Sequence, residues 1–425
     1  MRPALPCVVV LEAMKNRALL IAPLLLALVA CGQAPTPVDP ATSVAITPGA
    51  PPSHSPLGSV PAPLLASAPP STSATAPPAP AASAYGAMVT ALSEPDGPFF
   101  SDNTISNETS YLQVAGPLAK LASPGGAYLG VGPEQSFTYI ALTRPKVAFI
   151  LDIRRQNMVL HLLYKAIFEE ASSRSHFVAL LLGRPYQAAG DPGAVAGIDA
   201  VLAHAEKNAP DKAGFAAAHA VLRARVEQHI HLDAEDKKTL EVVHRSFLDG
   251  QLELRFALKQ KSGRRYPTLR EILARKDPAG KQSGFLADEA AFRFVQTMEK
   301  EGRVIPVVGD FAGDRAMPGI AAEIRKQGLT VSAFYVSNVE QYLFEPGVWA
   351  KWSRNVAALP TDEKSLFIRA WLDQGKRHPQ QLEGQRTATL LQRIADFDEH
   401  QAKKPYASWL AVATDRVLGD SGAPL

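Results

Sequence analysis

The sequence predicts an α/β fold, a Rossmann-like parallel sheet with flanking helices and a helical insertion. Short apolar runs typical of buried strands alternate with segments of helical periodicity. The connections between them are short, which favours parallel strands joined by right-handed crossovers. This alternation stops over residues 187–302, where the chain is polar, Ala-rich and mostly helical, and then resumes.

Five buried strands and four helices are expected around that insertion. The strands are expected at 127–132, 146–151, 304–308, 330–336 and 365–370, and the helices at 111–121, 134–142, 158–182 and 318–327. Pro133 suits the first position of the second helix, where its missing N–H costs nothing. Residues 96–186 should therefore form the first half of the domain, and 303–425 the second half with C-terminal helices.

The N-terminus carries a targeting pattern. A short basic stretch at 14–17 precedes an uncharged apolar run at 18–30, which is shorter than the about 20 residues that a spanning helix needs. Leu28-Val29-Ala30-Cys31 follows and resembles the bacterial lipobox. The resemblance implies a signal peptide over 1–31 and a lipoprotein that is fatty-acylated at Cys31. Translation is expected to start at Met14 rather than at Met1. The protein would then be lipid-anchored in the bacterial cell envelope, at the outer membrane or on a periplasmic face.

Residues 32–95 are expected to be a disordered tether between the lipid and the folded part. From 33 to 80 the chain is rich in Pro, Ala, Ser and Thr, and Asp39 is its only charged residue. Such a composition cannot bury a core and favours extended conformations.

Composition limits the partners and cofactors. The net charge of +3 comes without a dense Lys/Arg block, which argues against nucleic acid. The two cysteines, Cys7 and Cys31, lie outside the expected domain, and no histidine pair has metal-ligand spacing, so no metal is expected. The membrane, through the lipid, and a small-molecule ligand remain as partners, and the sequence does not identify a protein partner.

The residues that could bind a ligand lie at the ends of the expected strands. Gly130 and Gly132 end the first strand, and Asp152, Asp310 and Asn338 follow the second, third and fourth. In open parallel sheets, ligands bind outside these carboxyl ends. A glycine turn admits a ligand, one acid can accept ribose hydroxyls, and another can accept an adenine amino group. Together they predict a nucleoside pocket. Taken singly, the glycines could be turn residues and the acids helix caps.

Glu134 discriminates between two classes of nucleoside. It stands at the N-terminus of the helix expected at 134–142, the one that follows the first strand. A dinucleotide would place its pyrophosphate there, and a carboxylate at that position would repel phosphate. The positive sulfonium of S-adenosylmethionine would tolerate it. An ordinary first-turn acid is an equally good interpretation of Glu134.

These motifs resemble those of class I S-adenosylmethionine-dependent methyltransferases. The likeness rests on Gly130-Val131-Gly132-Pro133-Glu134, Asp152, Gly309-Asp310 and the segment 337–343 (SNVEQYL), and covers about 99–186 and 303–369. GVGPEQSFTYIA and FILDIRRQNMVLHLLYKA are similar to an uncharacterised bacterial group with this fold. The resemblance implies S-adenosylmethionine as cofactor at Gly130, Gly132, Glu134, Asp152, Asp310 and Asn338, with Glu340 and Tyr342 near the methyl-transfer position.

Two functions are expected from these patterns. One is methyl transfer to a small acceptor, which needs alignment in a dry pocket rather than a strong catalytic signature. The alternative is a non-catalytic, lipid-anchored binding protein that kept the fold and lost or replaced the cofactor. Export favours the alternative, since S-adenosylmethionine is a cytoplasmic metabolite.

Overall fold

The computed structural model describes residues 83–101, 103–258, 265–373 and 375–425. Cys31, the expected signal peptide and the expected tether up to residue 82 lie outside these residues.

A six-stranded sheet is the centre of the fold. In chain order its strands are β1 (Ala127–Gly130), β2 (Val147–Asp152), β3 (Val304–Val308), β4 (Val331–Ser337), β5 (Leu366–Leu372) and β6 (Thr387–Arg393). Their spatial order is β3-β2-β1-β4-β5-β6, with all neighbours parallel except β5 and β6. The order reverses between β1 and β4, which is the topological switch point of a doubly wound sheet. The predicted fold class, a Rossmann-like α/β fold, is confirmed.

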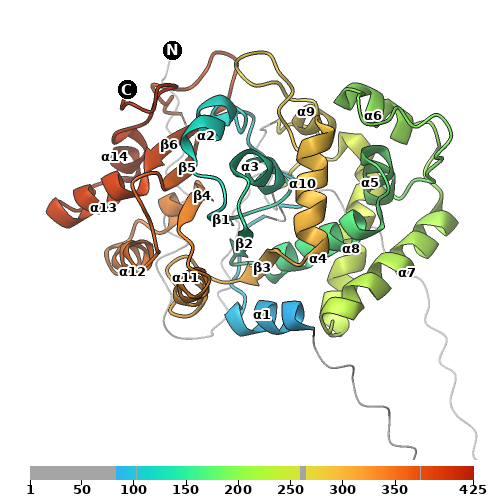
Figure 1. The fold of residues 1–425 in the computed structure, drawn as a ribbon, viewed down its shortest axis with the longest axis horizontal. Helices are drawn as coiled ribbons and strands as arrows, with labels where there is room; N and C mark the ends of the chain where they lie inside the picture. The colour runs from blue at the N-terminus through green and yellow to red at the C-terminus, as the bar shows by residue number, and fades with distance from the viewer. Residues whose placement is uncertain (1–82, 102, 259–264, 374) are drawn as a thin grey trace, which may run out of the picture. The chain divides into compact units, whose positions relative to one another are not determined.

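Helices cover both faces of the sheet, which Figure 1 shows edge-on. On one side lie α2 (Ala115–Leu121), α3 (Gln135–Thr143), α4 (Arg155–Glu170) and α10 (Glu289–Lys300). On the other lie α1 (Ala84–Leu92), α11 (Ala316–Lys326), α12 (Pro346–Ala357), α13 (Ile394–Lys403) and α14 (Trp409–Thr414). The 3-10 turn η3 (Val339–Tyr342) follows β4. Among the described residues, no helix combines the length and the apolar character needed to cross a bilayer.

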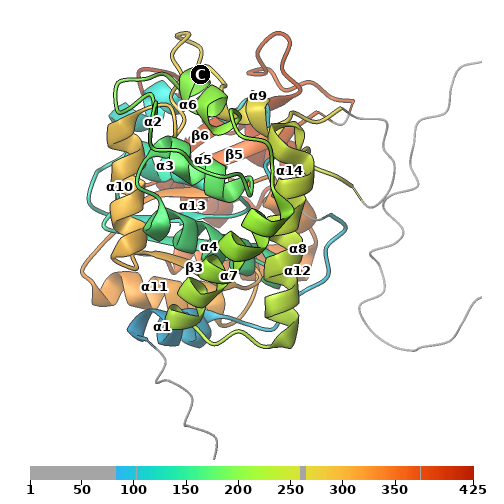
Figure 2. The same cartoon turned by 90° about the vertical axis from the view of Figure 1, so that its right-hand side faces the viewer.

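The expected helical insertion lies on the β2–β3 side of the sheet. It contains α6 (Ile198–Ala205), α7 (Lys212–His229), α8 (Ala234–Gly250), the 3-10 turn η2 (Gln251–Glu253), α9 (Leu269–Leu273) and α10. Figure 2 shows α5 (Arg174–Leu181) to α8 stacked on this side. Since α7 and α8 pack on α4, and α10 packs on both α3 and α4, the insertion is continuous with the sheet's own helical layer.

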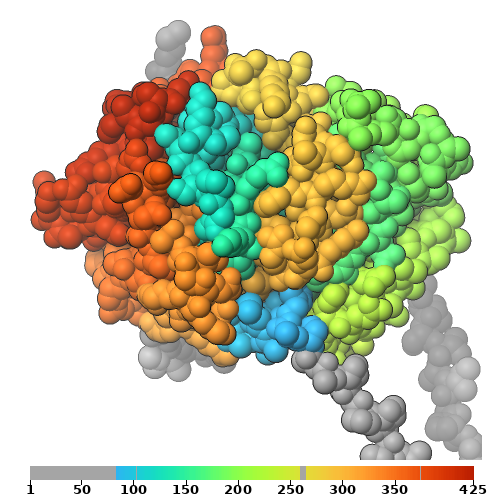
Figure 3. Space-filling view, viewed as in Figure 1, coloured from blue at the N-terminus to red at the C-terminus, as the bar shows by residue number. Residues whose placement is uncertain are grey.

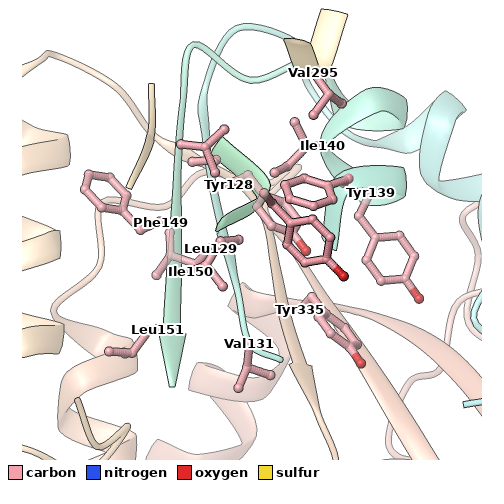
Figure 4. Close-up of a cluster of buried hydrophobic side chains, with 14 of the residues drawn as sticks. Tyr128, Leu129, Val131, Tyr139, Ile140, Phe149, Ile150, Leu151, Val295 and Tyr335 are labelled. Carbon is pink, nitrogen blue, oxygen red and sulfur yellow. The ribbon is translucent and has the colours of Figure 1, made fainter. Parts of the chain in front are cut away.

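The core lies where both faces of the central strands are covered. Every residue of β1, β2 and β3 is buried, so these strands are apolar throughout rather than alternating. Figure 4 shows the side chains of Leu129, Phe149 and Ile150 in this core. The ring centroids of Tyr139 and Tyr335 are 5.0 Å apart. Each fully buried side chain of this size contributes roughly 1.5–3 kcal/mol relative to an exposed one.

Helix α1 corrects the expected start of the folded part. It lies within 32–95, the stretch expected to be tether, yet Val89 and Leu92 are buried and the helix packs on β3 and α11. Ser83 caps it, with its hydroxyl accepting a bond from Gly86 N at 3.1 Å. Figure 3 shows α1 filling the surface between α11 and the insertion. Residues 84–92 therefore belong to the folded part rather than to a tether, because one face of this short helix is apolar.

Two other elements differ from expectation. The helix expected at 158–182 is two helices, because Ser173 caps a new one by accepting a bond from His176 N at 3.1 Å. Residues 387–393, expected among C-terminal helices, form the antiparallel edge strand β6, of which all but the last residue is buried. Its burial on both faces removes the alternation that would reveal a half-buried strand.

Candidate functional site

The predicted site residues lie along one edge of the sheet. Because β3, β2, β1 and β4 are parallel neighbours, their carboxyl ends face the same way. Asp310 follows β3, Asp152 ends β2, Gly130 ends β1 and Asn338 follows β4. The geometry at each position then decides what that edge can bind.

Gly130 and Gly132 are each required to be glycine for a different structural reason. Gly132 has φ of +76°, which favours glycine, and a Cβ there would meet no atom within 4 Å. A Cβ on Gly130 would come within 2.7 Å of the Tyr128 ring and 2.9 Å of Ser136 Oγ. The space beside Gly130 is therefore taken by the protein's own side chains, while that beside Gly132 is open.

Asp152 is already paired. Its Oδ1 accepts hydrogen bonds of 3.0 Å from both the backbone N and Nε of Arg154, and its Oδ2 accepts one of 2.8 Å from Nη2. The two side chains are only 6% and 8% exposed. The Arg154 guanidinium also lies over the Phe99 ring, 5.6 Å from its centroid. Both oxygens that a ribose would need are thus occupied by a buried guanidinium.

Asp310 is engaged in local turn structure. Its Oδ1 accepts a bond of 2.9 Å from Ala312 N, and its own N–H donates to Glu94 Oε2 at 3.1 Å. Glu94 also accepts bonds of 2.8 and 2.7 Å from the N–H groups of Arg315 and Ala316, at the start of α11. Glu94 therefore takes the position at this helix N-terminus that an anion would find favourable.

Residues 93–101 and 103–111, here called the crossing segment, run along the carboxyl edge. The first half binds β3 and β2: Glu94 N donates to Val308 O at the end of β3 (2.8 Å), and Gly97 N to Ile153 O just after β2 (2.9 Å). The sequence predicts an irregular lead-in over 98–111 before a short helix at 111–121, but not that this lead-in crosses the strand ends. The signal that could have revealed the segment is its many small polar residues, whose side chains and N–H groups reach the strand ends.

The second half of the crossing segment continues past β1 to β6. Ser106 N donates to Glu134 Oε1 (3.1 Å), Ser337 Oγ at the end of β4 donates to Glu108 (2.5 Å), and the Ser110 and Thr389 hydroxyls are 3.1 Å apart. The chain's own backbone thus lies where a nucleoside would lie in an open doubly wound sheet.

Two carboxyl groups, Glu108 of the crossing segment and Glu134 after β1, are buried at this edge of the sheet. Glu134 is 2% exposed and accepts a bond from Ser106 N; burial, with a smaller contribution from the charge of Glu108, raises its pKa to about 7 despite the backbone hydrogen bonds that it accepts. Glu108 is also 2% exposed, and burial raises its pKa despite bonds from Ser337, Tyr335 (2.5 Å) and Gln135 (3.2 Å). Glu134 therefore ties the glycine turn to the crossing segment, rather than facing an open pocket.

The residues after β4 separate into two groups. Asn338 Nδ2 donates to Tyr342 OH (3.4 Å), and the Tyr342 ring meets Phe99 edge-on at 5.9 Å, so both stay at the carboxyl edge. Glu340 is fully buried and paired with Arg369 at 2.5 Å. Its expected place near a transferred methyl group was therefore wrong: the turn η3 directs this side chain into the core.

The sequence was compared with known proteins. Residues 103–419 match the model of a family described as "Domain of unknown function (DUF7790)". The chain belongs to this family. The family's match is continuous from the crossing segment through the insertion to α14, so the insertion is part of the family's domain. No curated protein matches the sequence.

In the described part of this DUF7790 domain, two small pockets lie near the crossing segment. One is bordered by Tyr111, Glu134 and Thr138 on the sheet side and by Phe285 on the insertion side, and it has room for about one water molecule. The other lies outside β5 between Arg265 and Arg386; its enclosed part has room for about two water molecules, and the rest opens to solvent. Neither is lined by Gly130, Gly132, Asp152 or Asp310. In the same described part of the chain, no three His, Cys, Asp or Glu side chains are grouped to hold a metal ion.

Proposed function

We propose that this chain is a lipid-anchored binding protein of the bacterial cell envelope. It keeps a methyltransferase-like Rossmann fold, but its nucleoside crevice is occupied by its own crossing segment. The anchor rests on the lipobox-like sequence ending at Cys31.

The pairing of Asp152 with Arg154 carries this proposal. A ribose could reach the Asp152 carboxylate only by displacing two side-chain hydrogen bonds of a buried ion pair. Each hydrogen bond to a charged group is worth roughly 1.5–3 kcal/mol. The combined cost, about 3–6 kcal/mol, corresponds to a loss of about two to four orders of magnitude in affinity.

The crossing segment adds a second barrier. A nucleoside lying along the carboxyl edge would have to replace the bonds of Gly97 N and Ser106 N as well as displace Arg154. The N–H of Ser106, which is buried, would be left without a partner at a cost of about 1–3 kcal/mol. The filled edge therefore supports a scaffold role for the Rossmann-like sheet.

Calorimetry with the mature chain tests the proposal directly. We expect no binding of S-adenosylmethionine, its demethylated product or NAD at millimolar concentration. Binding of S-adenosylmethionine that is lost in Asp152→Ala would overturn the proposal.

Methyl transfer to a small acceptor is the second candidate, and the open space beside Gly132 favours it. That backbone could receive a ligand if Arg154 moved away from Asp152. The same titration decides between the two, because a working methyltransferase must bind S-adenosylmethionine.

A further inference from the structure

Two arginines from distant parts of the chain line one pocket at the same carboxyl edge. Arg265 comes from the insertion and Arg386 from the residue before β6, and both are exposed. The pocket lies outside the end of β5, where Leu372 and Asp373 border it. This is the edge of the sheet at which α/β folds bind their ligands.

The lining of the pocket carries more positive than negative charge. Among the described residues, the Arg386 guanidinium forms no ion pair, and Arg265 has only Glu271 at 3.8 Å, with both groups well exposed. The single acid that borders the pocket, Asp373, already accepts a 2.9 Å bond from Gly375 N. Two arginines against one acid leave a net positive lining, which would attract an anion.

Neutral donors complete the lining. Asn107 and Thr109 of the crossing segment and Thr387 of β6 border the pocket. The Thr109 and Thr387 hydroxyls are 3.3 Å apart, and Thr387 Oγ1 accepts a bond of 3.0 Å from Ser110 N. These bonds fix β6 and the crossing segment together, so the pocket walls are held in register rather than carried on separate loops.

Position and size define what fits. The Arg386 backbone is held at both ends, its N–H donating to Thr109 Oγ1 (3.3 Å) and its carbonyl accepting from Asp373 N (3.1 Å). The enclosed part of the pocket has room for about two water molecules, and the remainder opens to solvent. That space suits a charged head group attached to a larger molecule, with Tyr266 and Pro267 as an apolar wall for the rest.

We infer that this pocket binds a phosphate group, held by the Arg265 and Arg386 guanidinium groups with Asn107 as a neutral donor. Guanidinium forks match phosphate oxygens in geometry and charge. The phosphate can come from a soluble ester or from a phospholipid head group of the membrane to which the chain is proposed to be anchored.

Calorimetric titration of the full chain with inorganic phosphate at low salt tests the site. We expect binding that Arg386→Gln and Arg265→Gln each weaken about tenfold or more, since each removes a charge-assisted contact. Lys376→Gln is the matched control: it removes one positive charge from the same exposed hairpin without touching the pocket, and should leave the affinity unchanged. No binding by the wild type, or equal weakening in all three variants, would overturn the inference.

A second arm separates the two sources. The Cys31→Ser chain is floated with vesicles of phosphatidylglycerol, with and without Arg386→Gln. Vesicle binding that depends on Arg386 assigns the pocket to a lipid head group. Binding of inorganic phosphate with no Arg386-dependent binding to vesicles assigns it to a soluble phosphate ester. This test is independent of the proposed function, because a nucleoside titration does not involve Arg265 or Arg386.

Discussion

Arg369 Nε lies 2.5 Å from Glu340 Oε2, and neither side chain is more than 2% exposed. Trp352 Nε1 donates to the same carboxylate at 3.1 Å, and Arg369 Nη1 donates to Gln392 Oε1 at 2.5 Å. The pair joins η3 and β5 to α12 and β6 within the core. Glu340 therefore holds the segment after β4 in place and has no access to a ligand.

Loss of the Glu340 charge should destabilise the protein strongly. Glu340→Gln leaves Arg369 buried without its counter-ion, and breaking such a pair costs about 3–5 kcal/mol. Urea unfolding followed by circular dichroism measures the loss. The double variant Glu340→Gln with Arg369→Met should be less destabilised than Glu340→Gln alone, since no charge is left buried. The exposed Glu345→Gln is the control, with an expected change within about 0.5 kcal/mol.

Glu94 should contribute to stability through three backbone bonds at the start of α11. Glu94→Ala leaves the N–H groups of Asp310, Arg315 and Ala316 without their acceptor. We expect a loss of about 1–3 kcal/mol in the free energy of unfolding. Asp314→Ala on the same loop removes an exposed acid paired with Lys351 and should cost at most about 1 kcal/mol. Equal losses in the two variants would contradict the capping role of Glu94.

The sequence predicted the sheet better than the state of its edge. Strand-end residues such as Asp152 and Asp310 could be placed because apolar runs mark buried strands and parallel topology aligns their ends. Their partners could not be placed from local pattern. Arg154 was visible beside Asp152, but only the packed structure shows its guanidinium turned back onto the carboxylate. The crossing segment makes contacts with residues up to 279 positions away, and no local periodicity encodes them.

Burial of Glu134 predicts a pH-dependent stability. Its pKa is raised from 4.5 to about 7, first by desolvation, so between these values the folded state keeps a proton that the unfolded state has lost. The free energy of unfolding should therefore fall as pH rises from 4.5 through 7, by an amount on the order of a few kcal/mol. Glu134→Gln should reduce this fall while keeping an acceptor for Ser106 N. Urea unfolding at pH 5 and pH 8 measures this difference in the free energy of unfolding. An unchanged pH dependence in Glu134→Gln would refute its assignment to Glu134.

Lipidation at Cys31 can be checked by metabolic labelling with a radioactive fatty acid. Cys31→Ser should abolish incorporation, because the cysteine that follows the Leu28-Val29-Ala30 pattern is the expected acceptor. Cys7→Ser is the matched control, since it removes the chain's other cysteine and should leave the label unchanged. Equal label in the wild type and Cys31→Ser would refute the anchor.

Arg154→Gln separates the two features that oppose nucleoside binding at the carboxyl edge, the Asp152–Arg154 ion pair and the crossing segment. The change leaves Asp152 buried without a counter-ion, so the free energy of unfolding should fall by about 3–5 kcal/mol. Arg154→Lys keeps the charge but loses the planar guanidinium that reaches both carboxylate oxygens. Its free energy of unfolding should lie between those of Arg154→Gln and the wild type. Neither variant should bind S-adenosylmethionine in calorimetry, because Gly97 N and Ser106 N still hold the crossing segment across the strand ends. Binding by Arg154→Gln would mean that the ion pair alone closes the crevice and that the crossing segment leaves room for a nucleoside.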